Sequence, residues 1–269
     1  VLERQGFAVE RRFGLGGTLI CFEALRNGEI DFYMEYTGTL SQAVLKVPGR
    51  PTRDEINTLL ASMDLHMLDE IGFNNTYAIA VRESQAQDLG LVTIADLAKY
   101  PNLPFAFSHE FLQRGDGWPG LAQLYSLNHK VEGIEHGLAY QAIADGAIDA
   151  TDAYSTDGEL LRYSLRVLDD NKSYFPAYRA APLARTDLST QVRSALLPLV
   201  NLIDDLEMQR LNAEVVVQGK SFQAVADVFI TSRSNELGLD QSQYESVSWQ
   251  QELWGHFLRH IQLTGVALL

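Results

Sequence analysis

Four tyrosines stand at the ends of strand-like runs in the sequence, and each has polar residues beside it. They are Tyr36, Tyr77, Tyr154 and Tyr178. Their polar neighbours are Thr37, Asn75, residues 155–157 and Arg179. The ends of strands are where α/β sheets bind small molecules, so this placement indicates a ligand site. A half-buried phenol also commonly caps a hydrophobic core, so packing is the alternative interpretation for each ring taken alone.

Motifs typical of enzymes are incomplete or missing. His109 and Glu110 match the opening of the HExxH zinc-protease motif, but the second histidine of that motif would stand at Gln113. The chain has no GxSxG nucleophile elbow, Walker A sequence or Cys/His cluster with metal spacing, so we expect no cofactor and no metal. The alternative from another class is an α/β enzyme that acts on a small polar metabolite and uses Asp116, His109 or Asp157 as acid or base.

The charge of the chain excludes several classes of partner. Lys and Arg number 21 against 35 Asp and Glu, which gives a formal net charge of -14. Such a field repels phosphate backbones and anionic lipid headgroups, so we expect no nucleic acid partner and no direct binding to a membrane surface.

Strand-like and helix-like runs alternate along the chain. Alternating apolar residues predict a strand at residues 7–13, and Gly28 ends the helix that precedes a second strand at residues 30–36. Capping boxes, which mark helix starts, lie at Thr52 with Glu55 and at Thr93 with Asp96. Further strands are expected at residues 65–71, 77–81, 105–108 and 148–154. Further helices are expected at residues 120–128, 138–145 and 190–229, with a break at residues 219–221. This order predicts an α/β fold with largely parallel sheets.

One long stretch resembles a known family. Residues 24–39, ALRNGEIDFYMEYTGT, are similar to the ALxxGxIDxYxEYTGT signature of the glycine betaine/choline/carnitine-binding proteins of osmoprotectant ABC importers. Shorter stretches resemble patterns of the same family in the same order, at residues 75–77, 111–117, 152–158 and 174–183. The resemblance covers residues 1–232.

This resemblance implies a type II periplasmic-binding-protein fold, in which two α/β lobes are joined by two crossover strands. It implies that residues 1–78 and 181–240 form one lobe, that residues 79–180 form the other, and that the crossovers fall near residues 77–81 and 178–182. Residues 241–269 are expected to form a C-terminal helical segment. That segment resembles the opening of the cognate permease domain, which indicates a fragment of a binding-protein-permease fusion, and a simple amphipathic helix is the alternative.

The resemblance also implies which residues bind ligand. In the family, tyrosines from both lobes form a cage around a trimethylammonium group, and the corresponding residues here are Tyr36, Tyr77, Tyr154 and Tyr178. A quaternary ammonium has no hydrogen-bond donor, so the face of an aromatic ring is its best partner. Arg114 matches the family arginine that pairs with a betaine carboxylate, with a surface arginine as the alternative. Thr37, Asn75 and Thr156 complete the predicted set.

The function implied by the resemblance is that of a solute-binding domain of an ABC importer, at the periplasmic or extracytoplasmic face of the cell membrane. We expect it to capture a quaternary-ammonium osmoprotectant such as glycine betaine, choline or carnitine and not to be an enzyme. Its protein partner would be an ABC permease subunit or domain, and it would associate with the membrane only through that permease or an anchor. A ligand-sensing domain of a membrane receptor would share the same pocket and stays open as an alternative.

Overall fold

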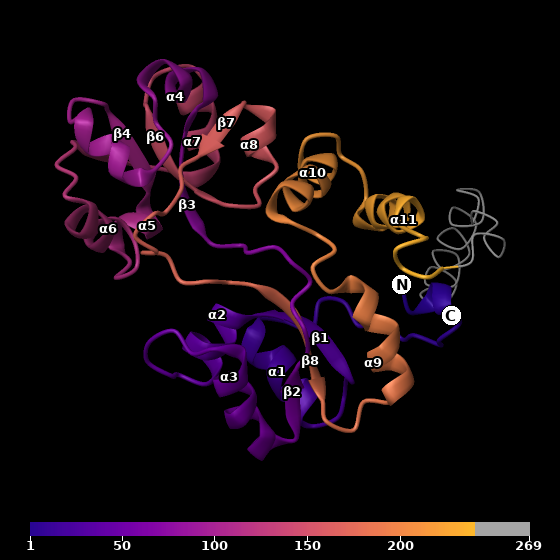
Figure 1. Cartoon of the computed structure of the whole chain (residues 1–269). Helices are drawn as coiled ribbons and strands as arrows, with labels where there is room; N and C mark the ends of the chain where they lie inside the picture. The colour runs from indigo at the N-terminus through magenta and orange to yellow at the C-terminus, as the bar shows by residue number, and fades with distance from the viewer. Residues whose placement is uncertain (240–269) are drawn as a thin grey trace, which may run out of the picture.

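The strands fall into two separate sheets, one in the lower half and one at the upper left of Figure 1. The computed structural model describes residues 1–239. The strands are β1 Phe32–Tyr36, β2 Leu65–Met67, β3 Tyr77–Arg82, β4 Phe105–Ser108, β5 Val131–Ile134, β6 Ala150–Tyr154, β7 Leu165–Val167 and β8 Ala180–Arg185. The order of the first sheet is β1-β8-β2, and that of the second is β5-β4-β6-β3-β7. Each sheet with the helices that cover it is called a lobe below.

The first lobe packs short helices on the three-stranded sheet. They are α1 Thr18–Arg26, α2 Thr37–Thr39, η2 Leu40–Val44, α3 Arg53–Leu60 and η3 Ala61–Met63. Helix α3 begins at the predicted capping box, in which Thr52 and Glu55 each bind the other's backbone. Its Ile56 and Leu60 are fully buried against Leu25 of α1, so the capped helix directs its apolar side into the core of this lobe.

The second lobe surrounds a larger, mixed sheet. Its helices are α4 Glu83–Leu89, η4 Ile94–Lys99, α5 His109–Gln113, α6 Trp118–Tyr125, α7 His136–Ala144 and α8 Glu159–Arg162. Strand β4 pairs in parallel with β5 and β6, whereas β3 pairs antiparallel with β6 and β7. Every residue of β4 is buried, as expected for a strand covered on both faces. Phe105 and Phe107 of β4 pack with Phe111 of α5 at the centre of this core.

Two segments, residues 68–76 and 168–179, run between the lobes and lie side by side (Figure 1). The backbone N–H of Asn75 donates to the carbonyl oxygen of Tyr178 at 3.0 Å, and the N–H of Tyr178 donates to Oδ1 of Asn74 at 2.6 Å. These bonds tie the two connections into one narrow waist between the lobes.

The crossovers were predicted a few residues too far along the chain. Residues 77–81 are part of β3 and are paired with β6 over their whole length, deep inside the second lobe. Residues 180–182 likewise belong to β8 and pair with β1 in the first lobe. An apolar run marks where a strand is buried, and the polar residues just before it, at 74–76, are the ones that cross between the sheets.

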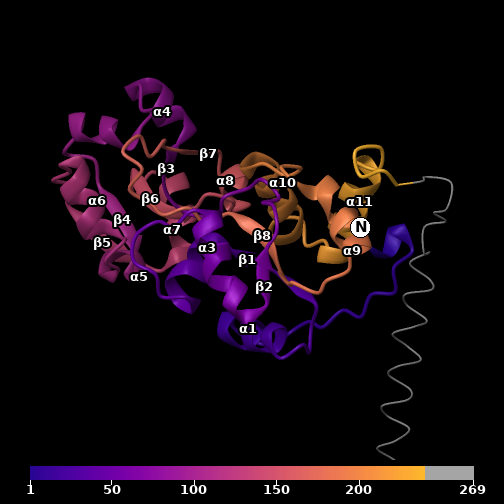
Figure 2. The same cartoon turned by 60° about the horizontal axis from the view of Figure 1, so that its bottom comes forward.

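The last described helices return toward the second lobe. They are α9 Thr190–Leu196, η5 Leu197–Leu199, α10 Asp205–Val216 and α11 Phe222–Ser232, with the predicted break at residues 219–221. Helix α9 lies beside the first lobe, whereas α10 approaches α8 (Figures 1 and 2). The side-chain amides of Gln209 and Asn212 in α10 donate to the carbonyl oxygens of Ser155 and Thr156 at 2.7 and 2.8 Å. Helix α10 therefore holds the loop that follows β6.

Two expectations about strands were wrong. Residues 7–13 form no strand, and Phe13 is 85% exposed there. Alternation makes a segment suitable for a sheet, but a strand forms only where a neighbour supplies hydrogen bonds, and no described strand pairs with this segment. The sheets are also less parallel than predicted, since the first contains only antiparallel pairs and the second is mixed.

The predicted helical segment at residues 241–269, with its resemblance to a permease opening, lies outside the described residues. Within residues 1–239, no helix combines the length and the apolar character that a membrane span requires.

Replacing Gly158 by alanine should weaken the contact between α10 and the second lobe. A methyl group at Gly158 would lie 2.5 Å from the backbone nitrogen of Ala213 in α10, so one of the two must shift. We expect Gly158→Ala to lower the free energy of unfolding by about 1–3 kcal/mol, the usual cost of overpacking. Urea denaturation measures this, with Gly137→Ala as the matched control, because a methyl group there would meet no described atom within 4 Å outside its own stretch of helix. Equal midpoints for the two variants would contradict the packing argument.

Candidate ligand-binding site

Two of the predicted tyrosines form a single aromatic wall in the second lobe. The antiparallel register of β3 and β6 places Tyr77 directly opposite Tyr154. Their ring centroids are 4.9 Å apart with 34° between the planes, and the two hydroxyl oxygens are 3.3 Å apart. Rings this close are in contact with each other, so they present one continuous surface and leave no space between them for a ligand. An opposing wall has to come from another part of the chain.

The core of the second lobe supports this wall from behind. The Tyr77 ring contacts Phe111 and Phe175, at centroid distances of 5.2 and 6.4 Å, and its residue is 7% exposed. Burial, followed by the hydrogen bond with Tyr154, raises the pKa of Tyr77. The phenol therefore stays protonated at neutral pH and donates to Oε1 of Glu110 at 3.3 Å.

Arg114 lies directly over the Tyr77 ring, with its guanidinium carbon 5.3 Å from the centroid. Its Nε and Nη2 donate to the two carboxylate oxygens of Asp116 at 2.7 and 2.8 Å, and its Nη1 donates to Glu110 at 3.1 Å. The bidentate pair lowers the pKa of Asp116. Arg114 thus lies against the wall, and it already has two acidic partners.

The first lobe contributes residues at the end of β1. Thr37 Oγ1 donates to the carbonyl oxygen of Ala177 at 3.2 Å and accepts from the N–H of Arg179 at 3.1 Å. Tyr178 lies between Ala177 and Arg179 in the chain, and its ring packs on Gly38. A methyl group at Gly38 would come within 2.7 Å of the ring carbons. Residues 36–38 therefore pack closely against the second crossover.

Asn75 connects the two lobes at this point. Thr156 Oγ1 donates to Oδ1 of Asn75 at 2.8 Å. Burial raises the pKa of Tyr36, and a hydrogen bond with the Asn75 side chain partly offsets that rise. Glu35, which is buried beside Tyr36, accepts the backbone N–H of Tyr36 at 2.7 Å and fixes the end of β1. Tyr36 of one lobe and Thr156 of the other thus share one amide side chain.

Tyr178 completes the connection between the predicted residues. Its hydroxyl donates to Oε1 of Gln42 in the first lobe at 3.2 Å. Burial raises the pKa of Tyr178, the negative charge of Asp116 adds to the rise, and Arg114 opposes it. The phenol therefore lies within electrostatic reach of the charged pair in the second lobe. Hydrogen bonds thus connect Thr37, Asn75 and Thr156 with the crossover that carries Tyr178. Tyr77, Tyr154 and Arg114 form a second group within the other lobe.

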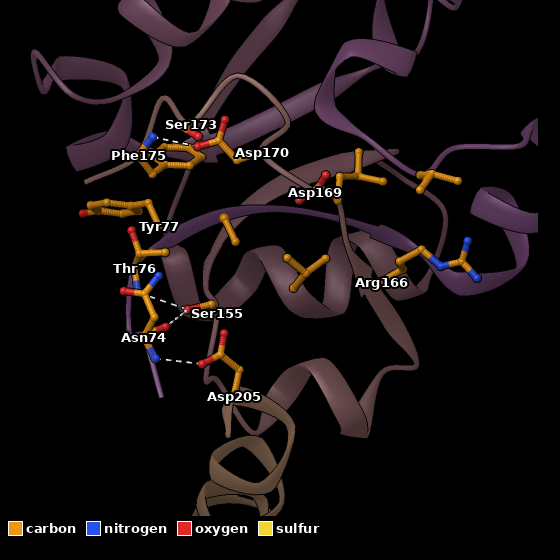
Figure 3. A pocket seen from close by; sticks show the side chains of 14 residues that line it. Asn74, Thr76, Tyr77, Ser155, Arg166, Asp169, Asp170, Ser173, Phe175 and Asp205 are labelled. Carbon is orange, nitrogen blue, oxygen red and sulfur yellow. Dashed lines mark hydrogen bonds between the residues drawn. The ribbon is translucent and has the colours of Figure 1, made fainter. Parts of the chain in front are cut away.

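A cavity of about 700 Å³ also runs along the waist, as Figure 3 shows. Asn74, Ser155 and Asp205 line it and are joined by hydrogen bonds, from Asn74 N to Asp205 Oδ1 at 2.7 Å and from Ser155 Oγ to the carbonyl oxygen of Asn74 at 2.5 Å. Of the eight predicted residues, Tyr77 alone belongs to its lining. The cavity and the predicted site therefore meet only at this ring.

A half-buried charged group that the sequence did not reveal lies behind Tyr154. The His136 ring is 5.6 Å from the Tyr154 ring, and its two nitrogens lie 3.7 Å from Oδ2 of Asp152 and 3.7 Å from Oδ2 of Asp157. Bonds to these carboxylates raise the pKa of His136 to about 10. Asp157 also accepts the N–H of Tyr154 at 2.9 Å and the hydroxyl of Tyr140. The imidazolium thus stabilises the turn that carries Tyr154.

The residues considered for an enzyme are occupied by structural contacts. Asp116 binds Arg114, Asp157 binds the turn after Tyr154, and His109 packs on Gly133. Within residues 1–239, no group of three or more His, Cys, Asp or Glu side chains is placed to hold a metal ion.

Sequence reasoning missed Glu110 and His136 as parts of this region. Glu110 and Arg114 are four residues apart in a helix, a spacing that favours an ion pair and could have been noticed. His136 stands 16 and 21 positions before its two partners, a separation that no local pattern indicates.

Known proteins resemble this chain over most of its length. The family model for the substrate binding domain of ABC-type glycine betaine transport systems matches residues 1–232. A glycine-betaine-binding protein of Pseudomonas aeruginosa is 32% identical over 249 residues, which cover 85% of this chain and 80% of that protein. The ergothioneine transport permease/ergothioneine binding protein of Helicobacter pylori is 33% identical over 246 residues, which cover 86% of this chain and 43% of that protein.

A solved structure confirms the predicted fold class. The crystal structure of a glycine betaine/carnitine/choline ABC transporter protein matches with a TM-score of 0.77 at 31% identity, over 82% of this chain and 85% of that chain. The two α/β lobes joined at a waist are thus those of a type II periplasmic-binding-protein fold. The match over residues 1–232 also confirms the resemblance seen in the signature at residues 24–39. The chain belongs to the family of substrate-binding domains of ABC-type glycine betaine transport systems.

Proposed function

We propose that this domain captures a small quaternary-ammonium solute, such as glycine betaine, choline or carnitine, in an aromatic cage between its lobes. The cage consists of Tyr36, Tyr77, Tyr154 and Tyr178, with Thr37, Asn75, Arg114 and Thr156 around it. The observation that carries the proposal is the continuous wall of Tyr77 and Tyr154, with Tyr178 of the second crossover within electrostatic reach of Tyr154.

The chemistry of the wall suits such a ligand. Methylated ammonium groups cannot donate hydrogen bonds, and the negative face of an aromatic ring attracts them by about 0.5–2 kcal/mol per ring. The side chains of Glu110 and Asp116 add two negative charges beside the wall against the one positive charge of Arg114. The formal net charge of -14 favours cations over anions near the whole domain.

Binding without chemical conversion is part of the proposal. A side chain catalyses proton transfer best when its pKa lies near the operating pH, whereas Arg114 moves the pKa of Asp116 further below neutral pH. A binding domain returns its ligand unchanged, so mass spectrometry of ligand recovered after long incubation separates this function from an enzyme. A receptor's sensor domain would return it unchanged as well, and co-purification with a permease distinguishes that alternative.

We also propose how the chain is divided and where it acts. Residues 1–78 and 181–240 would form one lobe and residues 79–180 the other. The membership of the two sheets supports this division except at its boundaries, because Tyr77 and Ala78 belong to the second sheet and Ala180 belongs to the first. Helix α10 departs from this division, because it packs on α8 and on the loop after β6. The domain would work at the extracytoplasmic face of the membrane with an ABC permease subunit or domain as its partner. The Helicobacter relative, whose name includes both a permease and a binding protein, supports that partnership.

Removing either ring of the wall should weaken binding. Tyr77→Ala and Tyr154→Ala each remove a ring face and admit water to the cation, so we expect affinity to fall about 10-fold to 100-fold, or about 1–3 kcal/mol. Phenylalanine at either position keeps the face and should cost less. Isothermal titration calorimetry with glycine betaine, choline, carnitine and ergothioneine measures the change. Tyr100→Ala is the matched control, since its hydroxyl binds the carbonyl oxygen of Leu89 away from the wall. Unchanged affinity in both wall variants would exclude the cage.

Ligand binding should bring the lobes together. Tyr77 and Tyr154 belong to the second lobe and Tyr36 belongs to the first. A ligand that touches both lobes therefore binds the closed arrangement more tightly and shifts the population toward it. Small-angle X-ray scattering should show a smaller radius of gyration in saturated protein than in ligand-free protein. Glycine at the same concentration serves as the control ligand, because it lacks the methyl groups that contact the rings. A radius that stays the same with a tightly bound ligand would contradict closure.

A further inference from the structure

The ion pair beside the wall has an unusual balance of charge. Arg114 has five N–H groups, of which two bind both oxygens of Asp116 and a third binds Glu110. Two carboxylates therefore surround one guanidinium, and the three side chains together carry one negative charge. The side chains of Arg114 and Asp116 are 35% and 29% exposed, so water screens the charges of this pair incompletely.

This balance matters for a ligand that carries a carboxylate. A free arginine offers a planar fork that matches a carboxylate in two parallel hydrogen bonds. Here the Nε and Nη2 fork is already filled by Asp116, and the remaining N–H groups lie beside two negative charges. A ligand carboxylate that approaches Arg114 must therefore compete with Asp116 and is repelled by Glu110, whereas the cationic head of the ligand is attracted by both.

We propose that Asp116 is a specificity-determining residue of the site, which by occupying Arg114 biases binding toward quaternary ammonium ligands that have no carboxylate. This inference rests on the proposed function, because it assumes that such ligands bind between the lobes. Asp116 sets the ratio of affinities for a zwitterion such as glycine betaine and a simple cation such as choline. Glu110 acts in the same direction more weakly, because its side chain is 62% exposed and it makes one bond to Arg114.

A purely structural role for the same pair makes a different prediction. Arg114 and Asp116 are two residues apart, so their bond could simply hold the loop before α6 in shape. Loss of that shape would lower the affinity for both ligands by the same factor. A change in the ratio of the two affinities is therefore the readout that separates the two roles.

The test is calorimetric titration of Asp116→Asn with glycine betaine and with choline at neutral pH. The substitution keeps the shape of the side chain, removes one negative charge and frees the arginine fork. We expect the ratio of glycine betaine affinity to choline affinity to rise about tenfold, the size of one charge-assisted hydrogen bond. In an Arg114→Gln background the same substitution should leave the ratio within about twofold, because the fork is gone.

The chain contains a closely matched control. Arg185 and Asp187 form the same bidentate pair two residues apart, with Nε and Nη2 bonds of 2.9 and 2.7 Å, at the end of β8 that is remote from Tyr178. Asp187→Asn should leave the ratio unchanged. If Asp116→Asn does not fold, Glu110→Gln tests the same idea on an exposed side chain and should raise the ratio about threefold, as a weaker charge-assisted bond would.

Each outcome has a definite meaning. An unchanged ratio in Asp116→Asn, or an equal loss of affinity for both ligands, overturns the specificity role while leaving the proposed function intact. Failure of wild-type protein to bind any quaternary ammonium compound refutes the proposed function, and this inference falls with it. A shift of the same size in Asp187→Asn would assign the effect to overall charge and would also overturn the role of Asp116.

Discussion

The antiparallel pairing of β3 with β6 is the interaction on which the rest of the site depends. It sets Tyr77 opposite Tyr154, and side chains alternate between the faces of a sheet, so a slip of one residue would turn one ring to the other side. The same pairing continues from the waist into the centre of the second lobe, where β3 is fully buried at four consecutive residues after Tyr77. The position of the aromatic wall is thus fixed by the core of the lobe and not by a mobile loop.

The waist positions the first lobe relative to this wall through hydrogen bonds. Asn75 bonds to Tyr178 through its backbone and to Thr156 through its side chain, so residues from both lobes depend on one crossover. Helix α10 adds a second support by binding the carbonyl groups of the loop after β6. Arg50, from a loop of the first lobe, donates to the carbonyl oxygens of Ser173 and Tyr174 on the other crossover. The lobes are therefore connected by polar contacts. Hydrogen bonds of this kind exchange partners more easily during a movement of the lobes than apolar side chains packed in a core do.

The sequence predicted local features well and remote pairings poorly. The capping box at Thr52 and the helix end at Gly28 depend on neighbours within four residues, and both helices appear where expected. The tyrosines emerged because each stands at the end of a strand-like run and within a stretch that resembles the family, Tyr36 in the long signature and the other three in shorter patterns. Residues 7–13 failed as a strand because sheet formation needs a partner that the segment's own pattern does not specify. His136 escaped notice for the same reason, since its carboxylate partners come from β6 and from the turn beyond it.

The histidine behind Tyr154 means that folding of the second lobe is coupled to uptake of a proton. An exposed imidazole in the unfolded chain has a pKa of about 6.5, whereas in the folded lobe the two carboxylates raise the pKa of His136 to about 10. Between these values the folded state holds a proton that the unfolded state has released. The stabilisation is fully present below pH of about 6.5 and is lost as the pH rises toward 10. In the folded lobe His136 therefore stays positively charged at neutral pH. At alkaline pH it loses its proton, and Asp152 and Asp157 beneath the aromatic wall lose their counterion.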